Sequence, residues 1–62
     1  MDRQKMEGYA ELVRLIVPLD DDLYTVGASA EAIKTAQNLA SILREDFERQ
    51  FGLSYTDVPG DN

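Results

Sequence analysis

The sequence predicts an all-α protein built as an antiparallel hairpin of two helices, at about residues 3–17 and 30–51. Three observations lead to this fold class. Apolar residues recur at intervals of three and four in both segments, as they do on one side of an α-helix. Residues that favour helix starts and stops flank both segments, and a connector at residues 18–29 with three consecutive aspartates separates them. A chain of 62 residues forms one domain, here residues 1–56, and residues 57–62 are expected to be a flexible tail.

The first predicted helix begins after Asp2, which can cap it and places a negative charge at its positive end. Pro18 ends it, because the residue before a proline is pushed out of the helical region. Gly8 within it costs about 1 kcal/mol relative to alanine, so we expect another element to approach closely there. Its apolar stripe consists of Met6, Tyr9, Ala10, Val13, Ile16 and Val17.

The second predicted helix has stronger boundary signals. Ser29 is a good N-cap residue, and Glu31 lies in the first turn, where the helix dipole favours a carboxylate. Gly52 can adopt the left-handed conformation that commonly closes a helix. The apolar stripe between these signals consists of Ile33, Ala36, Ala40, Leu43, Phe47 and Phe51.

An alternative is a small α+β fold, in which LVRLIV and LYTV form a short hairpin of strands between helices. The β-branched residues of the first stretch favour this alternative. The helical interpretation is preferred because the stripe that begins at Met6 continues without a break to Val17.

Both predicted helices carry apolar residues away from their main stripe. Leu12 and Leu15 do so on the first helix, and Leu39 and Ile42 on the second. The second helix is also longer, so a hairpin would leave its C-terminal end uncovered. The residues predicted to form an interface are therefore Leu12, Leu15, Leu39, Ile42, Phe47 and Phe51.

A helix that is apolar on more than one side is expected to be buried on more than one side. The predicted partner is a second copy, giving a two-fold homodimer that forms a four-helix bundle, or else another protein. In the alternative arrangement, the connector and tail of the same chain cover these residues. The apolar side chains available for this are Leu19, Leu23, Tyr24, Val26, Leu53 and Tyr55.

The three aspartates invite comparison with a calcium-binding helix–loop–helix. Counted from Asp20, the oxygen ligands at positions 1, 3 and 12 of that motif would be Asp20, Asp22 and Glu31. Position 5, however, is Tyr24, and position 6, where the motif needs glycine, is Thr25. The stretch is therefore interpreted as a solvated connector, and no metal or cofactor is expected.

Composition excludes several classes of function. The chain has no cysteine or histidine, and its serines have no base to activate them, so we expect no enzyme activity. A net charge of −6 disfavours direct binding to nucleic acid and to anionic membranes. The beginning of the sequence lacks the apolar core of a signal peptide, and a cytoplasmic location is expected.

What remains is a small acidic, non-enzymatic protein–protein interaction module: an adaptor, inhibitor or regulatory subunit that acts through apolar helix faces. An alternative is an inhibitor whose carboxylates imitate nucleic-acid phosphates in the groove of a basic protein. The carboxylates are dispersed among arginines, which favours the first interpretation. A degenerate calcium-binding helix–loop–helix is a third, more distant alternative.

Overall fold

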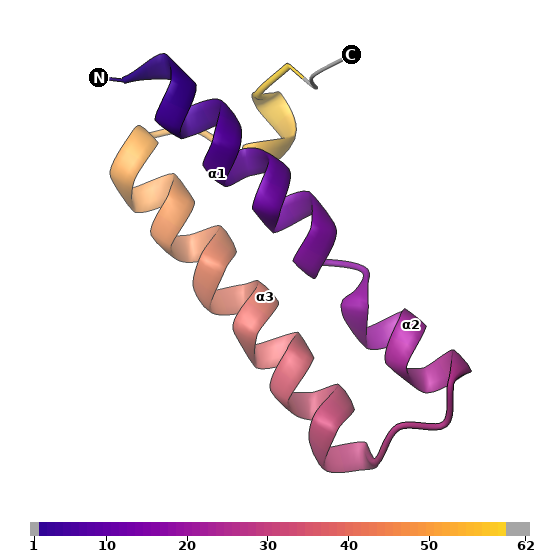
Figure 1. Ribbon diagram of the computed structural model, residues 1–62. Coiled ribbons are helices and arrows are strands. Elements are labelled where there is room, and N and C mark those ends of the chain that lie inside the picture. The colour runs from indigo at the N-terminus through magenta and orange to yellow at the C-terminus, as the bar shows by residue number, and fades with distance from the viewer. Residues whose placement is uncertain (1, 60–62) are drawn as a thin grey trace.

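The computed structural model describes residues 2–59, and its regular elements are all helices (Figure 1). They are α1 (Arg3–Ile16), α2 (Leu19–Thr25), α3 (Ala30–Phe51) and a short 3₁₀ helix, η1 (Tyr55–Asp57). α1 and α3 lie side by side and run antiparallel. The all-α prediction is confirmed, and the α+β alternative is wrong, because no strand occurs within residues 2–59.

The ends of α1 and α3 follow the local signals in the sequence. The Asp2 carboxylate accepts hydrogen bonds from the backbone N–H groups of Gln4 and Lys5, at 3.0 and 3.3 Å. The Ser29 hydroxyl accepts one from the N–H of Ala32 at 3.2 Å, and Gly52 closes α3 with a φ of 74°. The Asp2 and Ser29 side chains accept from N–H groups that have no partner inside the helix, and the Gly52 N–H donates to the Glu48 carbonyl near the end of α3.

The connector differs from the prediction because it contains helix α2. Pro18 ends α1 but stands at the N-cap of α2, since its fixed φ is compatible with the start of a helix. Asp20, Asp21 and Asp22 then fill the first turn of α2, where the helix dipole favours negative charge. Gln37 of α3 donates a hydrogen bond to Asp20 at 3.2 Å and ties α2 to α3.

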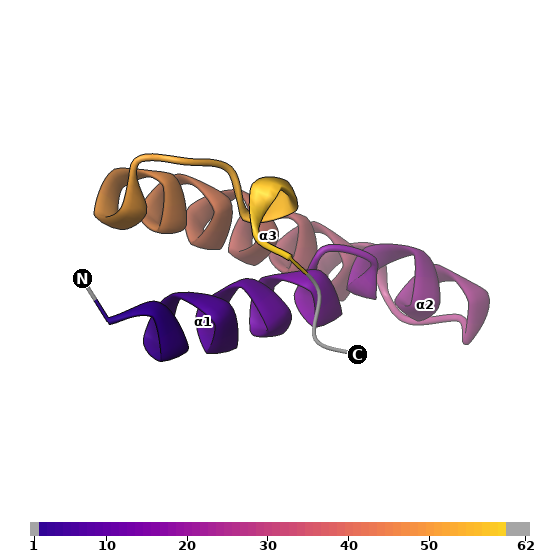
Figure 2. The ribbon, with the colours of Figure 1, turned by 90° about the horizontal axis from the view of Figure 1, so that it is seen from above.

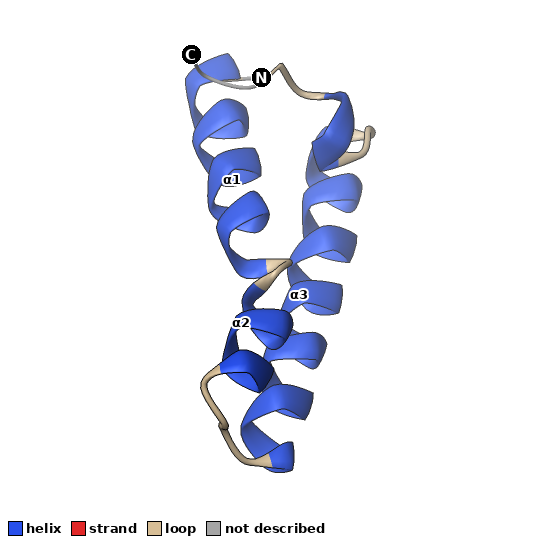
Figure 3. Ribbon diagram, turned by 90° about the vertical axis from the view of Figure 1, so that its right-hand side faces the viewer, coloured by secondary structure: helices blue, strands red, loops and turns tan. Residues whose placement is uncertain are grey.

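α2 resolves the difference in helix length. α1 spans roughly 21 Å and α3 roughly 33 Å at 1.5 Å per residue, and α2 continues the line of α1 along the N-terminal half of α3 (Figure 3). The C-terminal end of α3 therefore packs against α1. The expectation that Phe47 and Phe51 overhang the first helix is corrected by this arrangement.

Residues 53–58, here called the C-terminal segment, return from the end of α3 and pack against both α1 and α3 (Figures 1 and 2). Val58 is 2% exposed, while Leu53 and Tyr55 are half-buried. The predicted flexible tail began at residue 57, but Asp57 belongs to η1 and the packed chain continues to Val58. No periodic pattern marks this contact in the sequence, because it joins a single apolar residue to helices far away along the chain. The rest of the predicted tail, residues 60–62, lies outside the described residues.

The core is small and centred where α1, α3 and the C-terminal segment meet. Ala10, Phe47 and Val58 are its buried centre, and partly buried side chains surround them: Met6, Tyr9, Phe51, Leu53 and Tyr55. The rings of Tyr9 and Phe47 meet edge to face at 5.4 Å, and those of Phe47 and Phe51 lie 4.7 Å apart. Such aromatic contacts add to the stabilisation that comes from burial alone.

Gly8 of α1 was expected to mark the close approach of another element. Gly8 is exposed, and a Cβ atom added there would meet nothing within 4 Å, so the expected close approach is not formed. Within the part of the chain that the structure describes, no helix combines the length and apolar character needed to cross a membrane.

Candidate functional site

The antiparallel α1–α3 layer has two broad faces, and different contacts lie on each. On one face, Arg14 of α1 donates hydrogen bonds to the backbone carbonyls of Tyr55, at 3.2 Å, and Val58. On the other face, the Tyr9 hydroxyl of α1 donates to the Asp46 carboxylate of α3 at 2.6 Å. The C-terminal segment therefore covers the first face and leaves the second uncovered.

Leu12 lies on the uncovered side of α1. It precedes Arg14 by two residues, which places it roughly 200° away around the helix from the side chain that binds the C-terminal segment. Its side chain is 60% exposed. An exposed leucine is ordinary when it stands alone, so its significance depends on what lies beside it.

Leu39 and Ile42 lie on the same uncovered side, contributed by α3. They precede Asp46 by two turns and one turn of helix, and Asp46 is held by Tyr9 on that face. Arg44, two residues after Ile42, faces the opposite way and lines a pocket together with the C-terminal segment. Leu39 is 40% exposed and Ile42 is 60% exposed. We call the surface that carries Leu12, Leu39 and Ile42 the open face.

A groove extends the open face toward α2. It has a volume of about 460 Å³ and is lined on one side by Leu19 and Leu23 of α2. Ala32, Ala36 and Leu39 of α3 line the other side, and Ser29, Glu31 and Thr35 add polar atoms to its lining. Leu39 thus connects the groove to the open face and makes the apolar surface continuous.

Tyr9 and Asp46 form the polar boundary of the open face. The Asp46 carboxylate also accepts a hydrogen bond from Gln50 at 2.8 Å. The pKa of Tyr9 is raised to about 12, first by its hydrogen bond to Asp46, then by burial, and then by the negative charge of that carboxylate. Tyr9 therefore stays protonated and acts as a donor at neutral pH, which holds α1 and α3 in register.

The structure brings together only part of the predicted interface. Leu12, Leu39 and Ile42 share the open face, and Leu15, 66% exposed, lies beside Leu12 toward the outer side of α1. Phe47 is completely buried in the core of its own chain. Phe51, the remaining predicted residue, is half-buried and packs against that same core.

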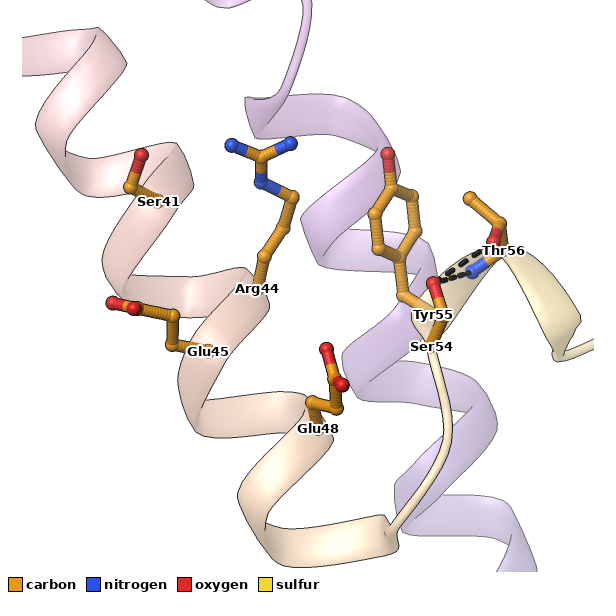
Figure 4. Close-up of a pocket in the computed structure, with 7 residues that line it drawn as sticks. All are labelled: Ser41, Arg44, Glu45, Glu48, Ser54, Tyr55 and Thr56. Carbon is orange, nitrogen blue, oxygen red and sulfur yellow. Dashed lines mark hydrogen bonds between the residues drawn. The ribbon is translucent and has the colours of Figure 1, made fainter.

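A polar pocket lies on the covered face. It has a volume of about 420 Å³, and its residues come from α3 and the C-terminal segment (Figure 4). Its lining residues are Ser41, Arg44, Glu45, Glu48, Ser54, Tyr55 and Thr56. One arginine stands among two glutamates, and all three are exposed to solvent. The surface beside the C-terminal segment is therefore polar, whereas the open face carries exposed apolar side chains.

The acidic residues considered for calcium do not form the loop that such a site requires. Asp20 and Asp22 lie in the first turn of α2, and Glu31 lies in the first turn of α3. Across residues 2–59, no group of three or more acidic side chains is placed to hold a metal ion.

Comparison of the chain with protein-family models, with curated proteins and with solved structures gives no match. Function is therefore inferred from the geometry of the chain itself. Two contacts that define the faces could not be predicted from the sequence: Arg14 with the C-terminal segment, and Tyr9 with Asp46. Both join residues about forty positions apart, and polar residues so far apart carry no periodic pattern.

Proposed function

We propose that the protein is a small acidic, non-enzymatic protein–protein interaction module, such as an adaptor, an inhibitor or a regulatory subunit. In this proposal another helical chain covers the open face. The observation that supports it is the contrast between the two faces: one is covered by the C-terminal segment, and the other exposes Leu12, Leu39 and Ile42 beside an apolar groove. Several exposed apolar side chains grouped on one face are typical of protein interaction sites.

The simplest partner is a second copy of the chain. Stacking two α1–α3 layers by their open faces would give a homodimer with the form of a four-helix bundle. The longest Cα extent of the chain is 39 Å, and two helices packed side by side are roughly 20 Å wide with their side chains. A face of these dimensions is comparable with the roughly 800 Å² that each partner buries in a stable interface. A chain of 62 residues buries little surface alone, so a partner would also stabilise it.

Capture of bound chains from cells that produce the protein tests this function. Three affinity-tagged forms are compared: the unchanged protein, Ile42→Glu, and the matched control Ser41→Glu. Both substitutions add one negative charge at an exposed position of α3, but only Ile42 lies on the open face. A second copy with a different tag is produced in the same cells.

We expect the unchanged protein and Ser41→Glu to retain the same bound chain, and Ile42→Glu to lose it at least about tenfold, because a charge is excluded from an apolar interface. Far-UV circular dichroism reports whether each variant keeps its helices. Equal capture by all three forms, or by none, would contradict the proposal.

A further inference from the structure

We infer that the chain on the open face is a second copy, docked with its α3 antiparallel to the first, so that Glu31 of each copy meets Arg49 of the other. This inference rests on the proposed function and specifies its partner and geometry. It follows from the pattern of side chains along α3 and from the distribution of charge between the two ends of the molecule.

On the exposed side of α3, side chains lie in pairs at equal distances before and after a midpoint of the helix. Leu39 and Ile42 are equally distant from a midpoint between residues 40 and 41, and so are Thr35 and Asp46. These four side chains lie within roughly 60° of one another around the helix. A two-fold axis at the midpoint therefore places Leu39 of one copy against Ile42 of the other, twice.

Glu31 and Arg49 extend this pattern at its two ends. They lie on the same side of α3 as Ile42, within roughly 20° around the helix. Glu31 lies 9.5 and Arg49 8.5 residues from the midpoint, so the same two-fold axis brings the two residues of different copies to within roughly 1.5 Å of each other along the helix, also twice. Two long side chains can accommodate that offset. Both residues are exposed, and among residues 2–59 the one ion pair of Arg49 is a long contact of 4.0 Å with Asp46. Either side chain can therefore reach a partner.

Two symmetric dimers can be formed by stacking the open faces of two copies, and the distribution of charge favours one of them. With the two-fold axis along the helices, both α2 ends lie together, and the aspartates at residues 20–22 of both copies are neighbours. With the axis across the helices, each α2 end lies beside the opposite end of the partner. That opposite end holds a mixture of charges: Arg3, Lys5, Arg44 and Arg49 together with Asp2, Glu7, Glu45, Asp46 and Glu48. The second arrangement keeps the two groups of three aspartates apart and places each beside an end that also carries basic side chains, so it is favoured.

Cross-linking tests the register directly, because the chain has no cysteine. Two purified variants, Glu31→Cys and Arg49→Cys, are treated with a short bismaleimide, separately and as a mixture. We expect the mixture to form a covalent dimer of twice 7.0 kDa. This dimer should be at least about tenfold more abundant in the mixture than with either variant alone. Adding Ile42→Glu to both variants should abolish it, since the open face is then blocked by charge.

Charge exchange gives an independent measurement. Glu31→Arg and Arg49→Glu should each weaken self-association about tenfold, because two symmetric attractions become repulsions. The double variant should recover most of the affinity. Each single change also places an unfavourable charge at an end of α3. The double variant keeps both unfavourable charges at the ends of α3. A recovered affinity of self-association would therefore report pairing between residues 31 and 49 of different chains.

The outcomes separate this inference from the function on which it rests. A dimer that gives no Glu31–Arg49 cross-link and no recovery in the double variant would overturn the antiparallel register. A monomeric protein at all concentrations would overturn the second copy as the partner. In that case, capture of a different chain that Ile42→Glu abolishes would still support the proposed function.

Discussion

The two faces of the α1–α3 layer are formed by the same two helices, but the C-terminal segment packs on only one of them. On the covered face, Val58 completes the core and Arg14 holds the backbone of the C-terminal segment. On the open face, the Tyr9–Asp46 hydrogen bond joins the helices, and Leu12, Leu39 and Ile42 remain exposed. A single layer of helices has two sides, and the chain described after α3 covers one of them. Substitutions on the two faces should therefore have different consequences, which the following predictions measure in order of size.

The largest effect is expected at the core beneath the covered face. Phe47→Ala should reduce the free energy of unfolding by about 3–5 kcal/mol, because it leaves a cavity in the centre of the core. This is comparable with the whole stability expected for a domain of this size, so the variant should be unfolded at 25 °C. Circular dichroism during urea denaturation measures it. Leu15→Ala, at a 66% exposed position, is the control and should change stability by less than about 0.5 kcal/mol. A folded Phe47→Ala variant would contradict the assigned core.

A smaller effect is expected where the C-terminal segment is held. Arg14→Ala should cost about 1–3 kcal/mol, because two backbone carbonyls lose a charged hydrogen-bond donor. Arg44→Ala removes the same charge from an exposed position of the polar pocket and should change stability by less than about 0.5 kcal/mol. Urea denaturation of both variants provides the comparison. Equal stability of the two would show that Arg14 does not hold the C-terminal segment.

The contact on the open face predicts a dependence on pH. Tyr9 has a pKa of about 12 in the folded chain, whereas an unfolded tyrosine has a pKa of about 10. Its stabilising contribution is therefore complete below pH ~10 and is lost as pH rises toward ~12, because the unfolded chain releases the proton first. Absorbance titration of tyrosine should show one ionisation near 12, which Tyr9→Phe should remove. Tyr9→Phe should also cost about 1 kcal/mol at neutral pH through loss of the hydrogen bond. Persistence of that ionisation in Tyr9→Phe would assign it to another residue.

The smallest change concerns the exposed side of α1 and has the opposite sign. Gly8→Ala should raise the free energy of unfolding by about 0.5–1 kcal/mol, because alanine favours the helix and nothing lies within 4 Å of the added Cβ atom. Thermal denaturation measures the shift. A destabilised variant would contradict this expectation and would indicate that another chain approaches α1 at Gly8, one helical turn from Leu12 of the open face.

The sequence predicted α3 from residue 30 to residue 51 because its boundaries depend on local signals, Ser29 at the start and Gly52 at the end. It did not predict α2 or the position of Val58, since both depend on packing against distant parts of the chain. The same limit explains the site. Helical spacing alone placed Leu12, Leu39 and Ile42 away from the main stripes. Phe47 was assigned to the interface because the missing α2 made the end of α3 look uncovered.

The central claim is that the open face is covered by another chain, in the simplest form a second copy. The most direct measurement is absolute mass by light scattering on a sizing column, over a range of concentrations and with a chelator present, for the unchanged protein and Ile42→Glu. Self-association through the open face predicts twice 7.0 kDa for the unchanged protein, falling toward 7.0 kDa on dilution, and no dimer of Ile42→Glu. A folded monomer of 7.0 kDa at every concentration, with Ile42→Glu identical to it, would contradict self-association through this face.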